Sequence, residues 1–188
     1  MSEIMMATPL VPMVLSGEKT QTRRMGSRWT KVKPGDVLAM REAFCARYVW
    51  PPTHEMPKGC AYRADWSEDA GVPGQRWTPA VHMPLELVRV HLHVVRVWQE
   101  RVSDISEADA RAEGMASLTA EGLLELGGSR RKIWKKLTEL DWGGTAQLCA
   151  AYGWDWMAPD KRFHMVAGVL GAKPGDVVMA IEFKAVRV

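Results

Sequence analysis

The sequence Lys-Pro-Gly-Asp-Val occurs twice, at residues 33–37 and 173–177, and an apolar run follows each copy. Each copy places Pro and Gly at the two central positions that a type II turn favours. Both copies therefore predict a tight turn that opens a buried β-strand, over residues 37–40 and 177–183. Similar turn chemistry explains the repetition, because a repeated domain would show similarity over roughly 20 residues or more.

A third and longer strand is predicted within residues 85–102. Its apolar side chains stand at every second residue. They occupy odd-numbered positions at Leu85 and Leu87, and even-numbered positions at Val88, Val90, Leu92 and Val94. One β-bulge, which inserts an extra residue into a strand, would explain this change.

Two short helices carry clear boundary signals. Residues 8–15 are predicted as a helix with Thr8 as its cap, Pro9 at its first position and Gly17 just past its end. Ser106 and Asp109 form a capping box that opens a second, alanine-rich helix, which Gly114 ends.

The remaining segments complete the fold prediction. Residues 119–141 have the periodicity of a helix interrupted at 127–128, whereas residues 43–80 and 142–172, rich in Trp, Pro and Gly, are predicted as long loops or insertions. Strands spread along the chain around few helices indicate an α+β fold, namely a small β-barrel with peripheral helices. A length of 188 residues favours one domain, residues 1–188.

Composition excludes several classes of protein. Hydrophobic residues make up 47% of the chain and charged residues 25%, which excludes disorder. No apolar run approaches the ~18 residues of a membrane span, and the first residues lack a signal-peptide pattern, so we expect a cytoplasmic protein. Cys45, Cys60 and Cys149 are too widely spaced for a disulfide framework or a zinc site. No cofactor is predicted, and the sequence does not indicate an oligomeric state.

Positive charge is concentrated in residues 19–47, where eight Lys or Arg stand against Asp36 and Glu42, which gives a net charge of +6. Such a segment attracts phosphates and polyanions, although a solvated basic face is the alternative explanation. Three tryptophans in or near the basic and loop-rich segments could stack on a nucleobase or simply pack in the core: Trp29, Trp66 and Trp77.

The candidate chemical groups are Lys19, Thr22 and Glu113. Lys19 is a phosphate anchor, a base if it is desolvated, or an ordinary surface lysine. Thr22 becomes a nucleophile only with a base beside it. Because residues three apart in a straight strand face opposite sides, this pairing requires a turn or bulge between Lys19 and Thr22. Glu113, in the last turn of its helix, either handles protons or faces water.

A metal site is not predicted. His91 and His93 fall on one face of the predicted long strand and could bind a metal as a pair, but no third ligand stands at a supporting spacing. We therefore interpret them as ordinary surface or core histidines.

Taken together, these features resemble the ASCH domain family, small proteins with a PUA-like barrel. The resemblance is carried by Gly17-x-Lys19-x-x-Thr22-x-Arg24, Lys33–Asp36, Ala112–Met115 and Ala180–Lys184. Three further fragments resemble the larger subgroup often encoded by phages and prophages: Arg41-Glu42, Tyr62–Asp65 and Trp77–Pro84. Relative to small family members, the resemblance implies insertions at about residues 43–80 and 116–172.

The resemblance also implies an activity. Some small bacterial members of the family are amidohydrolases that remove the acetyl group from N4-acetylcytidine with a Lys, a Thr three residues later and a distant Glu. These residues correspond to Lys19, Thr22 and Glu113. The implied mechanism is attack by Thr22 on the amide carbonyl, with Lys19 as general base and Glu113 orienting it or handling the leaving-group proton.

The same resemblance implies a partner, either RNA or a modified nucleoside, and leaves alternatives open. The residues expected to bind it are Arg23, Arg24, Arg41, Glu42, Trp77 and His82. Other family members are described as ribonucleases or RNA binders, so the alternatives to an amidohydrolase are a ribonuclease, a non-catalytic RNA-binding module and a phage-associated interaction protein.

Overall fold

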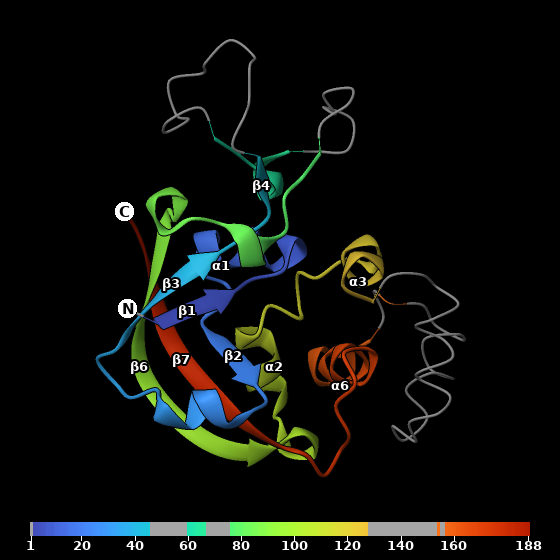
Figure 1. Cartoon of the computed structure of the whole chain (residues 1–188). Helices are drawn as coiled ribbons and strands as arrows, with labels where there is room; N and C mark the ends of the chain where they lie inside the picture. The colour runs from blue at the N-terminus through green and yellow to red at the C-terminus, as the bar shows by residue number, and fades with distance from the viewer. Residues whose placement is uncertain (1, 46–59, 67–75, 128–153, 155–156) are drawn as a thin grey trace.

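The computed structural model describes residues 2–45, 60–66, 76–127, 154 and 157–188. Its main element is a five-stranded sheet with the order β1-β3-β6-β7-β2. The strands are β1 (Ser2–Met5), β2 (Gln21–Arg24), β3 (Val37–Arg41), β6 (Val90–Arg101) and β7 (Val177–Arg187). The β1–β3 pair is parallel and the other three pairs are antiparallel. Figure 1 shows that β6 and β7 curve strongly, which makes the sheet a half-barrel.

The other elements surround this sheet. Strands β4 (Phe44–Cys45) and β5 (Ala61–Tyr62) form a separate small sheet. The α-helices are α1 (Val11–Ser16), α2 (Glu107–Ala112), α3 (Ala120–Gly127) and α6 (Pro159–Val169). The structure thus confirms the mixed α+β class and a curled sheet. In the part of the chain that the structure describes, no helix has the length and apolarity needed to cross a membrane.

The two Lys-Pro-Gly-Asp segments form the predicted turns. In each, the Asp amide donates to the Lys carbonyl at 3.1 Å, and the Asp carboxylate accepts from the Lys backbone amide, at 2.9 Å for Asp36 and 2.8 Å for Asp176. Gly35 has a φ of 91°, as a type II turn requires. Gly175 lies outside the positive-φ region, so the prediction of a second type II turn is wrong although the hydrogen bonds are the same.

The long strand has the predicted bulge, but at a different place. The register of β6 against β7 shifts between Val94 and Arg96. The change of parity near Leu87 has another cause, because residues Leu85–Leu87 form a 3-10 turn before β6 begins at Val90. The bulge increases the local bend of the strand, in keeping with its curvature in Figure 1.

The first predicted helix is two consecutive pieces, a 3-10 turn at Thr8–Leu10 and α1. The prediction of a Thr8 cap is wrong: Thr8 is the first residue of the turn, Ala7 precedes it, and no side chain caps it. Gly17 ends α1 with a φ of 81°, as predicted.

The prediction of loops over residues 142–172 is wrong where the structure describes this segment, because α6 lies in it. Pro159 stands in the first turn of α6, a position that proline favours. Residues on nearly every side of α6 are buried, so its sequence lacks the amphipathic pattern of a surface helix. Helix α3 agrees with the predicted interruption at 127–128; the continuation over 128–141 lies outside the described residues.

Of the three apolar clusters in the described residues, two join the half-barrel to the α-helices. One cluster joins the sheet to α1 and includes Ile4, Val14, Leu92, Ile181 and Phe183. The other joins the sheet to α2, α3 and α6 and includes Val178, Ala110, Leu123, Phe163 and Met165. Strand β2 pairs with β7 at the edge of the sheet, and its Arg23 contacts Asp109 of α2 and the Phe163 ring of α6.

Helix α2 ends in a Schellman motif that fixes Glu113. The amide of Gly114 donates to Arg111 O at 2.8 Å, and that of Met115 donates to Ala110 O at 3.1 Å. Ser106 caps the other end by accepting from the Asp109 amide at 3.1 Å, which confirms the capping box. Both ends of α2 are therefore anchored, and Glu113 occupies its C-cap position.

Gly114→Ala is expected to destabilise the protein more than Gly171→Ala. Both glycines have a φ near 90°, and a side chain there costs about 1 kcal/mol. A Cβ on Gly171 would meet nothing within 4 Å, whereas one on Gly114 would lie 2.7 Å from Met13 Sδ. We expect losses in the free energy of unfolding of about 1 kcal/mol for Gly171→Ala and about 2–3 kcal/mol for Gly114→Ala, measured by chemical denaturation. Equal losses would contradict the close contact at Gly114.

Candidate functional site: a buried lysine–glutamate pair in a cavity

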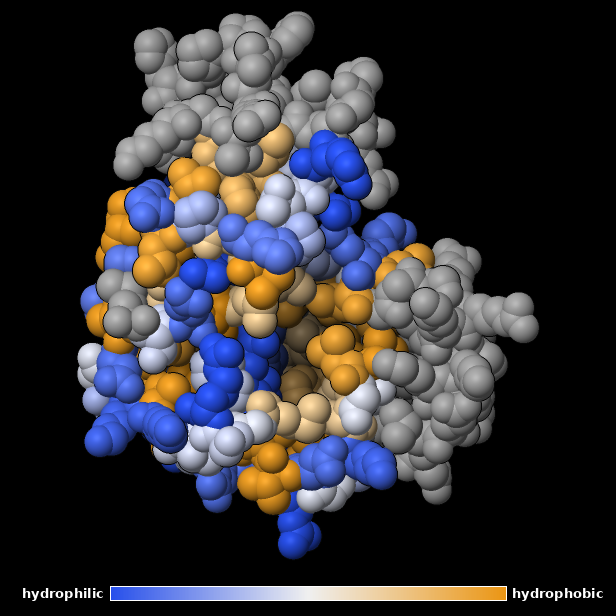
Figure 2. Space-filling view, in the orientation of Figure 1, coloured by the Kyte–Doolittle hydropathy of each residue, from blue (hydrophilic) through white to orange (hydrophobic). Residues whose placement is uncertain are grey.

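A cavity of about 590 Å³ opens beside β2. Figure 2 shows a hollow on this face of the molecule, with hydrophilic side chains along one side and hydrophobic ones along the other. Its polar and charged lining comes from Lys19, Thr22, Arg23, Arg24, Arg28 and Glu113. Its apolar lining includes Leu10, Leu126, Phe163, Val166 and Leu170. Lys19, Thr22 and Glu113, the three candidate chemical groups, therefore all line one cavity.

The segment between α1 and β2 is fixed by backbone hydrogen bonds. After the left-handed Gly17, the Lys19 amide donates to Met13 O at 2.9 Å. Thr20 then bridges two distant elements: its amide donates to Ala112 O of α2 and its carbonyl accepts from Phe183 of β7, both at 2.8 Å. Lys19 thus lies in a turn before β2, and Thr22 lies within β2. Both line the cavity, but within the described residues no hydrogen bond joins Lys19 Nζ to Thr22 Oγ1, since the amine donates to Gln21 O and to Glu113.

Lys19 is buried, with 1% of its surface exposed. Its Nζ donates to Gln21 O at 2.8 Å, to Glu113 O at 2.9 Å and, in a short contact, to Glu113 Oε2. Burial lowers the pKa of Lys19, the attraction of Glu113 opposes this, and the positive charges of Arg24 and Arg23 add to the lowering. A lysine in this setting loses its proton more easily than one in water.

Thr22 is buried in the middle of β2, opposite Ile181 of β7. It lines the same cavity as Lys19 and Glu113, in a wall that also carries Arg24. A hydroxyl and a lysine amine beside one cavity are the two components of a base-activated nucleophile.

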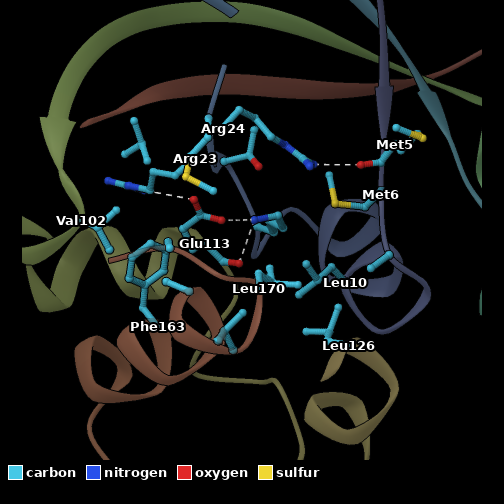
Figure 3. A pocket seen from close by; sticks show the side chains of 18 of the residues that line it. Met5, Met6, Leu10, Arg23, Arg24, Val102, Glu113, Leu126, Phe163 and Leu170 are labelled. Carbon is cyan, nitrogen blue, oxygen red and sulfur yellow. Dashed lines mark hydrogen bonds and ion pairs between the residues drawn. The ribbon is translucent and has the colours of Figure 1, made fainter. Parts of the chain in front are cut away.

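Arg24 and Arg28 connect the two edge strands of the half-barrel. Arg24 Nη2 donates to Met5 O at 2.8 Å, as Figure 3 shows, and Arg28 Nη2 donates to Glu3 O at 2.6 Å. Both guanidinium groups lie over the Trp29 ring, at 5.8 Å and 4.3 Å from its centroid. Burial, and to a smaller extent Arg28, lowers the pKa of Arg24. Strands β1 and β2 are the two ends of the strand order, and hydrogen bonds from these two arginine side chains connect them beside the cavity.

Four other residues expected to bind a partner do not line this cavity: Arg41, Glu42, Trp77 and His82. Arg41 donates to Glu3 Oε1 at 2.6 Å and to Val81 O at 3.1 Å. Glu42 is buried and accepts two hydrogen bonds from Arg89, at 2.8 and 2.9 Å. Burial raises the pKa of Glu42, and the contact with Arg89 opposes this. The Glu42–Arg89 pair connects β3 to the start of β6, so its position is that of a structural ion pair.

Among the tryptophans considered for base stacking, Trp29 lines the cavity, and neither Trp66 nor Trp77 does. Helix α6 and the end of α3 provide the apolar wall of the cavity. The contribution of α6 was not expected, because residues 142–172 are predicted as loops. The signal that marks α6 is local: Pro159 and Asp160 stand in a first helical turn, and Phe163, Val166, Ala167 and Leu170 follow at helical spacing.

Within the described ranges, no group of three or more His, Cys, Asp or Glu side chains is placed to hold a metal ion. Comparisons with protein-family models, curated proteins and solved structures gave no match. The fold and the site therefore define the class: an α+β half-barrel protein whose cavity contains a buried lysine–carboxylate pair and a threonine.

Proposed function

We propose that this protein is an amidohydrolase that removes the acyl group from N4-acylated cytidine, and that its half-barrel is a PUA-like ASCH fold. The observation that supports the activity is Lys19, a buried lysine in contact with Glu113 in the cavity that Thr22 also lines. Burying a charged amine is costly, and groups with such perturbed titration concentrate at functional sites.

The proposed reaction proceeds in two steps. Thr22 Oγ1 attacks the amide carbonyl carbon while Lys19 takes the hydroxyl proton and Glu113 holds the lysine in place. The tetrahedral intermediate collapses, the C–N bond breaks, and Lys19 returns the proton to the departing cytidine amine. A water molecule, deprotonated by Lys19, then hydrolyses the acyl-threonine ester, which releases the carboxylate and regenerates Thr22. Arg24, beside Thr22, binds the substrate.

The size and lining of the cavity favour a small molecule as substrate. Its volume of about 590 Å³ falls within the range of roughly 300–1,000 Å³ that is typical of small-molecule sites. Its mixed lining suits a nucleoside that carries an apolar acyl group. A second candidate function, RNA binding without catalysis, is supported by the exposed basic side chains that follow β2: Arg28, Lys31 and Lys33.

The test is release of acetate from N4-acetylcytidine by the purified protein. We expect acetate and cytidine in equal amounts, and no reaction with N4-methylcytidine, which has no carbonyl group to attack. Absence of acetate release, together with RNA affinity that falls as salt concentration rises, would contradict the hydrolase and support the binding module. Cleavage of RNA without acetate release would support a ribonuclease.

A further inference from the structure

Arg23 follows Thr22 in β2, and the two side chains leave the strand on opposite faces, although both line the cavity at this edge of the sheet. Arg23 stands opposite Ala180 of β7, which in turn pairs with Trp98 of β6, whereas Thr22 stands opposite Ile181. Successive residues of a strand point to opposite faces. The Arg23 side chain is 3% exposed, and its guanidinium group lies 5.7 Å from the Trp98 ring and 5.9 Å from the Phe163 ring. It is therefore enclosed by β6 and α6.

The guanidinium group of Arg23 is surrounded by protein oxygens. Its Nε donates to Glu100 Oε1 at 2.6 Å and its Nη1 to Gln21 Oε1 at 2.8 Å. Nη2 lies 3.5 Å from Asp109 Oδ1, an ion-pair distance, and has no hydrogen-bond partner among the described residues. Nη1 also lies 3.5 Å from Glu113 Oε1, the contact drawn from Arg23 in Figure 3. Partners on β2, β6 and α2 thus orient Arg23 toward Glu113.

Glu113 is consequently held by a cation on each carboxylate oxygen. Lys19 contacts Oε2 and Arg23 contacts Oε1. With Arg23 on one oxygen, the carboxylate cannot rotate away from Lys19 without losing an ionic contact. Arginine suits this role because its planar fork of donors can reach several carboxylates at once.

We propose that Arg23 is a positioning residue. Its contact with Glu113 Oε1 keeps Glu113 Oε2 in contact with Lys19. This inference rests on the proposed function and stands beside the expectation that Arg23, which lines the cavity, binds the substrate. Arg23 Nε and Nη1 donate to protein oxygens, whereas its Nη2 has no hydrogen-bond partner among the described residues.

The charge of Arg23 also acts on Lys19. The charged groups that bear on the lysine are Glu113 from α2 and Arg23 and Arg24 from β2; α6 presents the apolar Phe163. Behind Arg23 stand Glu100 and Asp109. Because Arg23 lowers the pKa of Lys19, removing its charge is expected to raise that pKa. A general base must be neutral, so the rate of hydrolysis would then rise only at higher pH.

The test compares Arg23→Met with Arg23→Lys. We measure kcat/KM for N4-acetylcytidine against pH and, independently, titrate Lys19 by NMR of its side-chain carbon. For Arg23→Met we expect the ascending limb of the profile and the Lys19 titration to move up by about 1 pH unit, with about 10-fold less activity at neutral pH. Arg23→Lys keeps the charge. It should lose activity, while the ascending limb of the profile and the Lys19 titration stay at their wild-type pH.

Arg111→Met is the matched control, because it removes one positive charge from an exposed arginine of α2 that pairs with Glu107. It should leave the profile in place. If Arg23→Met lowers the melting temperature but moves neither the profile nor the Lys19 titration, Arg23 is merely structural and the inference is wrong. If the wild-type protein releases no acetate, the proposed function fails, and the NMR titration alone still decides whether Arg23 acts on Lys19.

Discussion

Lys19→Met is expected to lower the free energy of unfolding by about 3–5 kcal/mol, because it leaves the Glu113 carboxylate buried without its main cation. Glu113 is 5% exposed, and its contact with Lys19 is the shortest that it makes. Arg23, 3.5 Å away, compensates only in part. In a domain of this size, such a loss lowers the melting temperature by roughly 10 °C.

The double variant Lys19→Met/Glu113→Gln provides the control. Replacing the carboxylate with an amide removes the unpaired charge, and replacing a whole buried ion pair is often neutral. We therefore expect the double variant to regain most of the stability while acetate release remains absent. Denaturation curves of the two single variants and the double variant give the coupling energy between the sites. Additive losses would show that Lys19 and Glu113 do not interact as the structure indicates.

Local sequence signals predicted part of the fold well. The turn at Lys33–Asp36, the Ser106 cap and the glycine that ends α2 depend on a few adjacent residues, and each has the expected hydrogen bonds. Helix α6 lies in a segment predicted as loops, although Pro159 and Asp160 are local signals of a helix start. Because several elements cover α6, most of its sides are buried, and the 3.6-residue periodicity that marks a surface helix is weak in its sequence.

The site was predictable only through the family resemblance. Lys19 and Glu113 are 94 residues apart, and no sequence pattern brings them together; the contact of Thr20 with Ala112 and Phe183 does so. Arg23 and Arg24 are adjacent arginines in a basic segment, and only Arg24 belongs to the motif that carries the resemblance. The pairing of β2 with β7 directs them to opposite faces of the sheet, which explains their different partners, although both line the cavity.

Glu42, expected from the resemblance to bind a partner, has an ionic contact that the sequence does not indicate. Its nearest basic neighbour in sequence is Arg41, but its ionic partner is Arg89, 47 residues away, which also binds Asp65. Arg89 lies 4.0 Å from the Tyr62 ring as well. A charged pair in sequence is therefore weak evidence for a binding site when each member has a tertiary partner.

Thr22→Val is expected to reduce acetate release from N4-acetylcytidine by at least ~10³-fold, because it removes the nucleophilic oxygen and keeps the shape of the side chain. Thr22→Ser, which retains a hydroxyl, should keep measurable activity. The free energy of unfolding should change by less than about 1 kcal/mol in both variants. Mass spectrometry of the wild-type protein mixed rapidly with substrate should detect an acetyl group on Thr22, and Thr22→Val should carry none. Full activity of Thr22→Val would show that water attacks the amide directly, with Lys19 as its base, and that Thr22 only shapes the cavity.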